Sequence, residues 1–352
     1  MKEAEHIRCA NMDVLRIVAS FMVIMIHVAA NKWHVTDVSS NEWVAMNFYD
    51  SAARSCVPIF FMLSGKLFLD REKMKPVSDM LKNNILKLAI IYVVWAALYA
   101  IDTIGVRGVF TMPNALGELT KLIIGAKYHL WFIPAMIGVY LLAPVMFSLK
   151  EYEKGKYVPY VLVMFFIFAI LLTTIKIIPF QNEYTEIMLD KVQYELVGYS
   201  GYFLLGYYLS KKEYPKIRKL MLVALFAVIV VVSTIIGQAH AINIGEPAGI
   251  LYGYGTLPVF LEAVLIFYCF LKIKIQVSAK TSKLITCISK CTLGIYLMHL
   301  FIIERLEIWL GINTTSFNTW FSIPIICVAV FVISTIVTLV LSKIPVINKW
   351  LI

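Results

Sequence analysis

Long apolar runs, separated by short polar segments, dominate this sequence. A helix needs about 20 residues to cross the roughly 30 Å hydrocarbon core of a membrane. Ten runs approach that length, at residues 13–31, 45–69, 84–105, 129–148, 157–178, 196–210, 219–236, 249–271, 284–304 and 320–342. The pattern predicts an all-α bundle of about ten transmembrane helices that forms a single domain over residues 1–352.

The second run is the least regular of the ten. Arg54 and Pro58 interrupt it, and the segment "FFMLSG" follows. Pro58 and Gly65 predict a kinked or broken helix, which a membrane tolerates only where protein or a water-filled cavity satisfies the freed backbone groups.

Lysine and arginine fall mainly in alternate loops, which sets the expected orientation. With the N-terminus in the cytoplasm, about 21 basic residues lie on the inner side and about 7 on the outer side. We therefore expect both termini to be cytoplasmic.

Composition supports a membrane protein. The chain is 60% hydrophobic and 15% charged, whereas an ordinary soluble domain carries about 25% charged residues. This excludes a soluble enzyme, a disordered tail and a disulfide-built secreted domain. The net charge of +10 indicates basic loops that face anionic lipid rather than nucleic acid. The six cysteines form no C-x-x-C pair, so a redox or zinc motif is not supported.

The presence of three polar residues in the first run requires an explanation, because a charged group inside a membrane costs free energy. Asp13 and Arg16 lie near its expected inner end, and His27 lies eleven residues after Arg16. Eleven residues make about three helical turns, which places Arg16 and His27 on nearly the same face. Two interpretations stay open for Arg16: a ligand role, or an interaction with lipid phosphates in which Asp13 is its partner. His27 is either reactive or an ordinary buried histidine.

Two other histidines have a similar expected depth. His129 opens the fourth run, and His299 lies near the outer end of the ninth. Three imidazoles can bind a metal, but these come from separate helices without an acidic ligand nearby in the sequence. We expect no metal.

Further polar residues lie at several depths. Arg54 is on the outer part of the second run, and Lys66 and Arg71 are toward its inner end. Glu262 lies within the eighth run, and its expected partner is either Arg54 or Lys290. The glycines of "GYSGYFLLGYY" in the sixth run are typical of close helix packing.

Four segments together resemble the acyltransferase-3 family of integral membrane acyltransferases. They are "MDVLRIVASFMVIMIHVA", "SAARSCVPIFFMLSGKLF", "YHLWFIPAMIGVYLLAPV" and "LGIYLMHL", in the family's order. The resemblance covers nearly the whole chain, and Arg16 and His27 match the family's arginine and histidine in spacing. Among its members the chain looks most like the surface-polysaccharide O-acetyltransferases of bacterial inner membranes.

The resemblance implies transfer of an acyl group, usually acetyl from cytoplasmic acetyl-CoA, to a hydroxyl of a cell-surface or lipid-linked glycan. His27 is the expected general base or acyl relay, since histidine is suited to proton transfer near neutral pH. The other expected site residues fall into three sets. Catalytic support comes from Arg16 and Asp13, donor binding from Arg54, Ser64, Lys66 and Arg71, and acceptor binding or support from His129, Trp131, Tyr296, His299 and Glu262.

Two alternatives from other classes remain. Some relatives resemble small-molecule carriers, notably a membrane domain that is fused to amino-acid racemases and linked to serine uptake. An outward cavity with Arg54, Glu262 and histidines can bind such a zwitterion. A degenerate member that acts as an assembly or sensing subunit is the other alternative. The acceptor, the acyl group, the choice between direct transfer and an acyl-histidine relay, and the oligomeric state stay open.

Overall fold

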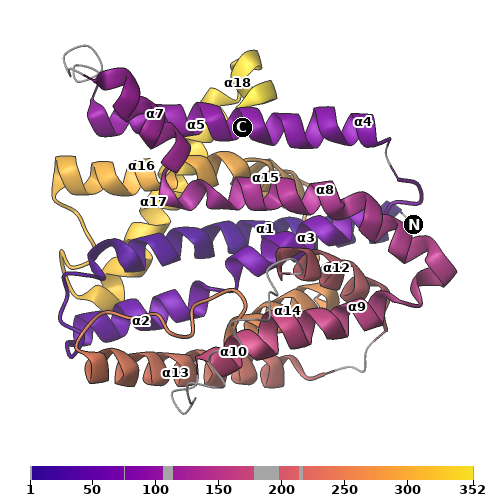
Figure 1. Ribbon diagram of the computed structural model, residues 1–352, viewed down its shortest axis with the longest axis horizontal. Helices are drawn as coiled ribbons and strands as arrows, with labels where there is room; N and C mark the ends of the chain where they lie inside the picture. The colour runs from indigo at the N-terminus through magenta and orange to yellow at the C-terminus, as the bar shows by residue number, and fades with distance from the viewer. Residues whose placement is uncertain are drawn as a thin grey trace.

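The fold is a bundle of helices, most of whose longer members run roughly along one direction (Figure 1). The computed structural model describes residues 2–74, 76–105, 114–177, 198–213, 217–273 and 275–351. Every regular element within these ranges is helical, and they contain no strand. The predicted all-α class is confirmed.

The elements follow the apolar runs of the sequence. The first half comprises α1 (Lys2–Ala29), η1 (Ala30–Lys32), α2 (Asn41–Ala53), α3 (Cys56–Leu69), α4 (Val77–Met80), η2 (Leu81–Ile85), α5 (Leu86–Ile104), α7 (Ala115–Gly125), η3 (Tyr128–Trp131), α8 (Phe132–Glu151) and η4 (Tyr152–Gly155). The second half comprises α9 (Val158–Phe165), η5 (Phe166–Leu171), α10 (Leu172–Lys176), α12 (Gly198–Lys211), α13 (Lys219–Ile244), α14 (Leu257–Lys272), α15 (Ala279–Lys290), α16 (Thr292–Leu310), α17 (Thr319–Leu341) and α18 (Pro345–Trp350).

Helix α1 is central to the bundle. It packs against α2, α3, α14, α15, α16 and α17. Its buried side chains include Leu15 and Ala19, which join one apolar core, and Ile24 and Val28, which join a second. A polar side chain on α1 is therefore enclosed by several helices rather than by lipid.

Fewer helices have membrane-spanning length than the sequence predicts. Seven helical segments within the described ranges are long and apolar enough to span, and the bent pair α15 and α16 makes an eighth if counted as one span. The predicted spans at 196–210 and 249–271 correspond to α12 and α14, of 14 and 16 residues. At 1.5 Å per residue these are about 21 and 24 Å long, short of the roughly 30 Å hydrocarbon core.

The second predicted span is broken, as its sequence indicates, but at a different point. Helix α2 ends at Ala53 and α3 begins at Cys56, so the break lies at Arg54 and Ser55. Pro58 is accommodated in the first turn of α3, where the N–H that proline lacks would have no partner within the helix. The break frees backbone and side chains beside a cavity, as described below.

Glycines allow α3 and α12 to meet at backbone distance. A Cβ atom at Gly65 would overlap the carbonyl group of Phe203, and one at Gly206 would overlap the carbonyl group of Met62. A Cβ at Gly201 would overlap the ring of Phe165. The close packing predicted for the glycines of the sixth run is confirmed at Gly201 and Gly206.

The eighth predicted span begins later than expected. Residues 249–256 are irregular, and α14 starts only at Leu257, with Pro258 in its first turn. Gly249, Gly253 and Gly255 interrupt this stretch, and glycine disfavours a helix interior. The irregular segment contributes Tyr252 and Tyr254 to cavity walls instead.

Candidate active site

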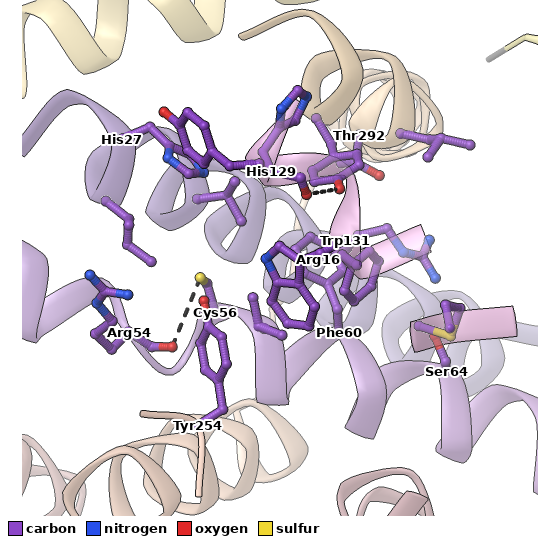
Figure 2. Close-up of a pocket in the computed structure, with 18 of the residues that line it drawn as sticks. Arg16, His27, Arg54, Cys56, Phe60, Ser64, His129, Trp131, Tyr254 and Thr292 are labelled. Atoms are coloured by element: carbon purple, nitrogen blue, oxygen red, sulfur yellow. Dashed lines mark hydrogen bonds between the residues drawn. The ribbon is translucent and has the colours of Figure 1, made fainter. Parts of the chain in front are cut away.

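A cavity of about 580 Å³ lies beside α1 and receives side chains from α3, η3, α8 and α16. We call it the His27 cavity. Seven of the predicted site residues line it: Arg16, His27, Arg54, Ser64, His129, Trp131 and Tyr296. Figure 2 shows His27 and Arg54 toward one end and Arg16 and Ser64 toward the other. The two α1 residues that share a face in the sequence thus face the same cavity.

Three histidines from three helical elements cluster at the His27 end. The ring centroid of His27 lies 4.9 Å from that of His299 and 6.4 Å from that of His129, and the latter two are 5.3 Å apart. His129 and His299 are buried, whereas His27 is partly exposed. His27 is therefore the member that a bound molecule can reach, and the other two pack around it.

Hydrogen bonds from α16 fix the surroundings of this cluster. The Tyr296 hydroxyl donates to the backbone carbonyl of His129 over 2.5 Å. The Nδ1 atom of His299 lies 2.6 Å from the carbonyl oxygen of Tyr296, so its N–H donates to that oxygen and Nε2 is left as an acceptor. These contacts hold the backbone of His129 and the ring of His299 in place.

Arg16 is held at the other end of the cavity by a polar network. Its Nη1 lies 3.4 Å from Asp13 Oδ1 and donates to the hydroxyl of Ser289 over 3.1 Å. Ser289 in turn donates to Asp13 Oδ1 over 2.8 Å, and Thr286 donates to Asp13 Oδ2 over 3.3 Å. Asp13 does not line the cavity; it orients Arg16, which does.

Ser64, on α3, is one of the residues expected to bind the donor. It lines the cavity and is hydrogen-bonded with Tyr140 of α8, which lines it too.

Lys66 and Arg71, expected beside Ser64, lie outside the cavity wall. Lys66 pairs with Asp70 over 3.5 Å, and Lys211 pairs with the same carboxylate. Burial raises the pKa of Asp70, but the hydrogen bond from Lys211 and the charge of Lys66 outweigh it and hold the pKa below its ordinary value. The guanidinium of Arg71 lies over the ring of Phe68 at 5.1 Å. These cations form a group of their own at the end of α3.

Arg54 and Glu262 do not pair with each other. Arg54 binds Asp50, four residues earlier, over 2.6 Å. Glu262 is buried in α14, and its Oε2 has no hydrogen-bond partner within the described part of the chain. Lys290 is exposed at the end of α15. Neither of the two partners expected for Glu262 contacts it.

Comparison with known proteins assigns the family. The "Acyltransferase domain" profile matches residues 10–339, which is nearly the whole chain. The chain belongs to the acyltransferase-3 family. Its long apolar helices and its family together indicate a multi-pass membrane protein.

The chain also shares distant similarity with a curated protein. An "Amino-acid racemase" from Enterococcus faecalis is 26% identical over 224 residues, which make up 60% of this chain and 30% of the relative. The chain thus spans less than a third of the length of that protein. No solved structure matches the chain.

Several polar residues of this acyltransferase-3 chain line the cavity without having been expected from its sequence. They are Cys56, Tyr140, Tyr254 and Thr292. Cys56 and Thr292 open the helices that follow the two breaks, α3 and α16. A helix break inside an apolar run is the sequence signal for such positions, because chain that leaves the helix inside a membrane must face protein or a cavity.

The cavity wall is aromatic as well as polar. Trp131 stacks on Tyr254 with ring centroids 5.5 Å apart and also contacts Tyr199. Tyr128 lies 5.4 Å from His27 by ring centroids. In the part of the chain that the structure describes, no group of three or more His, Cys, Asp and Glu side chains has an arrangement that could hold a metal ion. The site is thus one imidazole within reach of a bound molecule, an arginine at the far end, and aromatic walls between them.

Proposed function

We propose that this acyltransferase moves an acetyl group from cytoplasmic acetyl-CoA to a hydroxyl of a cell-surface or lipid-linked glycan, at the inner membrane of a bacterium. The observation that carries the proposal is that one cavity joins Arg16 at one end to His27 at the other. Donor and acceptor can therefore enter from opposite ends and meet at one imidazole.

Arg16 supports binding of the donor. A guanidinium is a strong donor to phosphate and carbonyl oxygens, and that of Arg16 is fixed by Asp13 and Ser289 at the cavity wall. Ser64 and Tyr140 line the same end, where they suit the amide groups of a pantetheine arm. Lys66 and Arg71 lie beyond the wall on the same helix end and suit the more distant phosphates of CoA.

His27 supports the chemical step. As general base, it takes the proton of the acceptor hydroxyl while the hydroxyl oxygen attacks the thioester carbonyl; the C–S bond then breaks and CoA leaves as a thiol after it gains that proton. As acyl relay, the imidazole nitrogen attacks the thioester carbonyl first, the C–S bond breaks, and CoA leaves as a thiol with the proton of the ring. The acceptor hydroxyl oxygen then attacks the acyl-imidazole, the bond from carbonyl carbon to nitrogen breaks, and the hydroxyl proton returns to the ring. Both routes need the same partly exposed ring, and neither needs a metal.

Removal of the His27 imidazole tests the proposal. In reconstituted protein supplied with acetyl-CoA and candidate glycan acceptors, we expect His27→Ala to lower CoA release by about 10²- to 10⁴-fold, the usual contribution of a positioned acid–base group. The matched control is His240→Ala, because His240 lies on α13 and lines none of the cavities described for this chain. Unchanged release by a folded His27→Ala protein would contradict the proposal.

A further inference from the structure

We propose that a second cavity next to His27 holds the acceptor as a polyhydroxylated sugar ring, and that the Asp50–Arg54 pair recognises one of its hydroxyl groups. This inference rests on the proposed function. The second cavity, which we call the Arg54 vestibule, measures about 460 Å³, and its wall includes Trp33, Asp50, Arg54, Tyr252 and Gly253.

The Arg54 vestibule and the His27 cavity share part of their walls. Ala30, Arg54 and Tyr254 line both. Ala30 follows His27 by less than one turn of α1. A ring that fills the vestibule can therefore present one hydroxyl to the imidazole without leaving it.

The Asp50–Arg54 pair has unused hydrogen-bonding capacity. Arg54 Nη2 donates to Asp50 Oδ2 over 2.6 Å, and the two side chains are 21% and 2% exposed. Within the described ranges, Asp50 Oδ1 and Arg54 Nε have no hydrogen-bond partner. Buried polar atoms without a partner are rare because they cost free energy.

A hydroxyl is the ligand group that satisfies both atoms. It accepts a hydrogen bond from an N–H group such as Arg54 Nε and donates its own hydrogen to a carboxylate oxygen such as Asp50 Oδ1. A zwitterionic amino acid is less suited, because Asp50 and Arg54 already neutralise each other and would have to separate to bind its two charges. The pair therefore favours a neutral, hydroxyl-bearing ligand over a zwitterion.

The remaining wall suits a sugar ring. The guanidinium of Arg54 is fixed over the ring of Tyr252 at 4.7 Å, and the partly exposed Tyr254 offers an aromatic surface with a polar end. A Cβ at Gly249 would overlap the Tyr252 ring, whereas a Cβ at Gly253 would make only an ordinary contact with Thr256. Gly253 is thus a wall position with room for an added Cβ atom.

Sugar binding to the reconstituted full chain tests the proposal. The probes are methyl α-D-glucopyranoside, methyl α-D-galactopyranoside and the methyl glycoside of N-acetylglucosamine, followed by saturation-transfer NMR, with L-serine as competitor. We expect at least one glycoside to bind and Asp50→Asn and Gly253→Leu to weaken it about tenfold or more, the usual effect of a lost charge-assisted hydrogen bond or a filled site. Serine should not displace it.

Glu307→Gln is the matched control. This substitution breaks the ion pair of Glu307 with Lys32 near the same end of α1. Glu307 lines neither the His27 cavity nor the Arg54 vestibule. Gly253→Leu keeps the Asp50–Arg54 pair, so the test stands even if Asp50→Asn fails to fold. Failure of all three glycosides to bind, equal binding to wild-type and Gly253→Leu proteins, or displacement by serine would overturn the sugar site.

A separate readout distinguishes this inference from the proposed function. CoA release from acetyl-CoA, measured on the same samples with water or each glycoside as the acceptor, reports turnover rather than sugar binding. If release depends on His27 but no sugar binding depends on the vestibule, only the vestibule inference fails. If sugar binds through the vestibule but no acetyl-CoA is turned over with any probe, the proposed function fails and the sugar site stands.

Discussion

At the residue scale, one hydroxyl connects the two charged side chains near the start of the first apolar run. Ser289 is buried, donates to Asp13 over 2.8 Å and accepts from Arg16 over 3.1 Å. We expect Ser289→Ala to release Arg16 from its position and raise the KM for acetyl-CoA by about tenfold, the effect of one lost hydrogen bond to a charged group, while kcat changes little. Steady-state CoA release at varied acetyl-CoA measures both constants.

Thr286→Val is the matched control for that change. Thr286 donates to the other oxygen of Asp13 over 3.3 Å and has no hydrogen bond with Arg16. Its loss should leave the KM for acetyl-CoA within about twofold, since a long hydrogen bond is weak. If Ser289→Ala also left the KM unchanged, Arg16 would not owe its position to Ser289.

The sequence predicts residues of the site where one helix carries them and misses those that the tertiary structure brings in. Helical spacing places Arg16 and His27 on one face, and similar depth groups His129 and His299 with them; all three imidazoles do cluster. Depth alone also groups Lys66 with the site, yet that side chain pairs with Asp70 outside the cavity wall.

Asp50 and Tyr254 line cavity walls but were not predicted from the sequence, for two different reasons. Asp50 precedes Arg54 by four residues on one helix face, so the i, i+4 spacing was a usable signal. Tyr254 belongs to an irregular segment inside an apolar run, and hydropathy does not separate such a segment from helix. Its place in the wall depends on packing between distant parts of the chain.

At the element scale, the contact between α3 and α12 is the most sensitive to an added methyl group. A Cβ at Gly65 would meet the backbone of Phe203, which cannot move aside as a side chain does. We expect Gly65→Ala to lower the free energy of unfolding by about 1–3 kcal/mol or more, as overpacking does. A fall in the thermal unfolding midpoint of the detergent-solubilised protein measures it.

Gly138→Ala is the control for the glycine substitution. Gly138 lies within α8, and a Cβ there would meet nothing within 4 Å. Alanine in a helix interior is more favourable than glycine by about 0.5–1 kcal/mol, so the unfolding midpoint should stay the same or rise. An equal fall for both variants would show that the α3–α12 contact is not the cause.

Helix type is predicted better than helix length along this chain. Apolar runs locate nearly every long helix, because twenty apolar residues have few alternatives in a membrane. The lengths of α12 and α14 and the 60° bend between α15 and α16 were not predicted. Both depend on packing against other helices. The irregular segment before α14 places Tyr254 in the cavity wall, and Thr292, which follows the bend, also lines the cavity. Breaks beside the cavity are therefore where tertiary packing overrides local pattern.

At the scale of the whole molecule, the position of α1 explains how one cavity reaches from Arg16 to His27. The helix packs against six others, and its cavity-facing residues, from Arg16 to Ala30, line the His27 cavity along its length. Under the proposed function, the donor would approach the His27 imidazole from the Arg16 end of this cavity and the acceptor from the other end. Its use as proposed requires that the Arg16 end face the cytoplasm.

Orientation in the membrane is accordingly the prediction on which the whole arrangement depends. The excess of basic loops on one side places the α1–α2 loop outside and the turn between α8 and α9 inside. Val35 and Lys156 are exposed at these two places. With the native cysteines replaced, we expect an impermeant maleimide added to intact cells to label the Val35→Cys protein and not the Lys156→Cys protein, and the reverse in inverted vesicles. Both proteins must retain CoA release, which serves as the control for folding. The opposite labelling pattern would place Arg16 on the outer side, where acetyl-CoA is absent, and the donor and acceptor ends assigned to the cavity would have to be exchanged or abandoned.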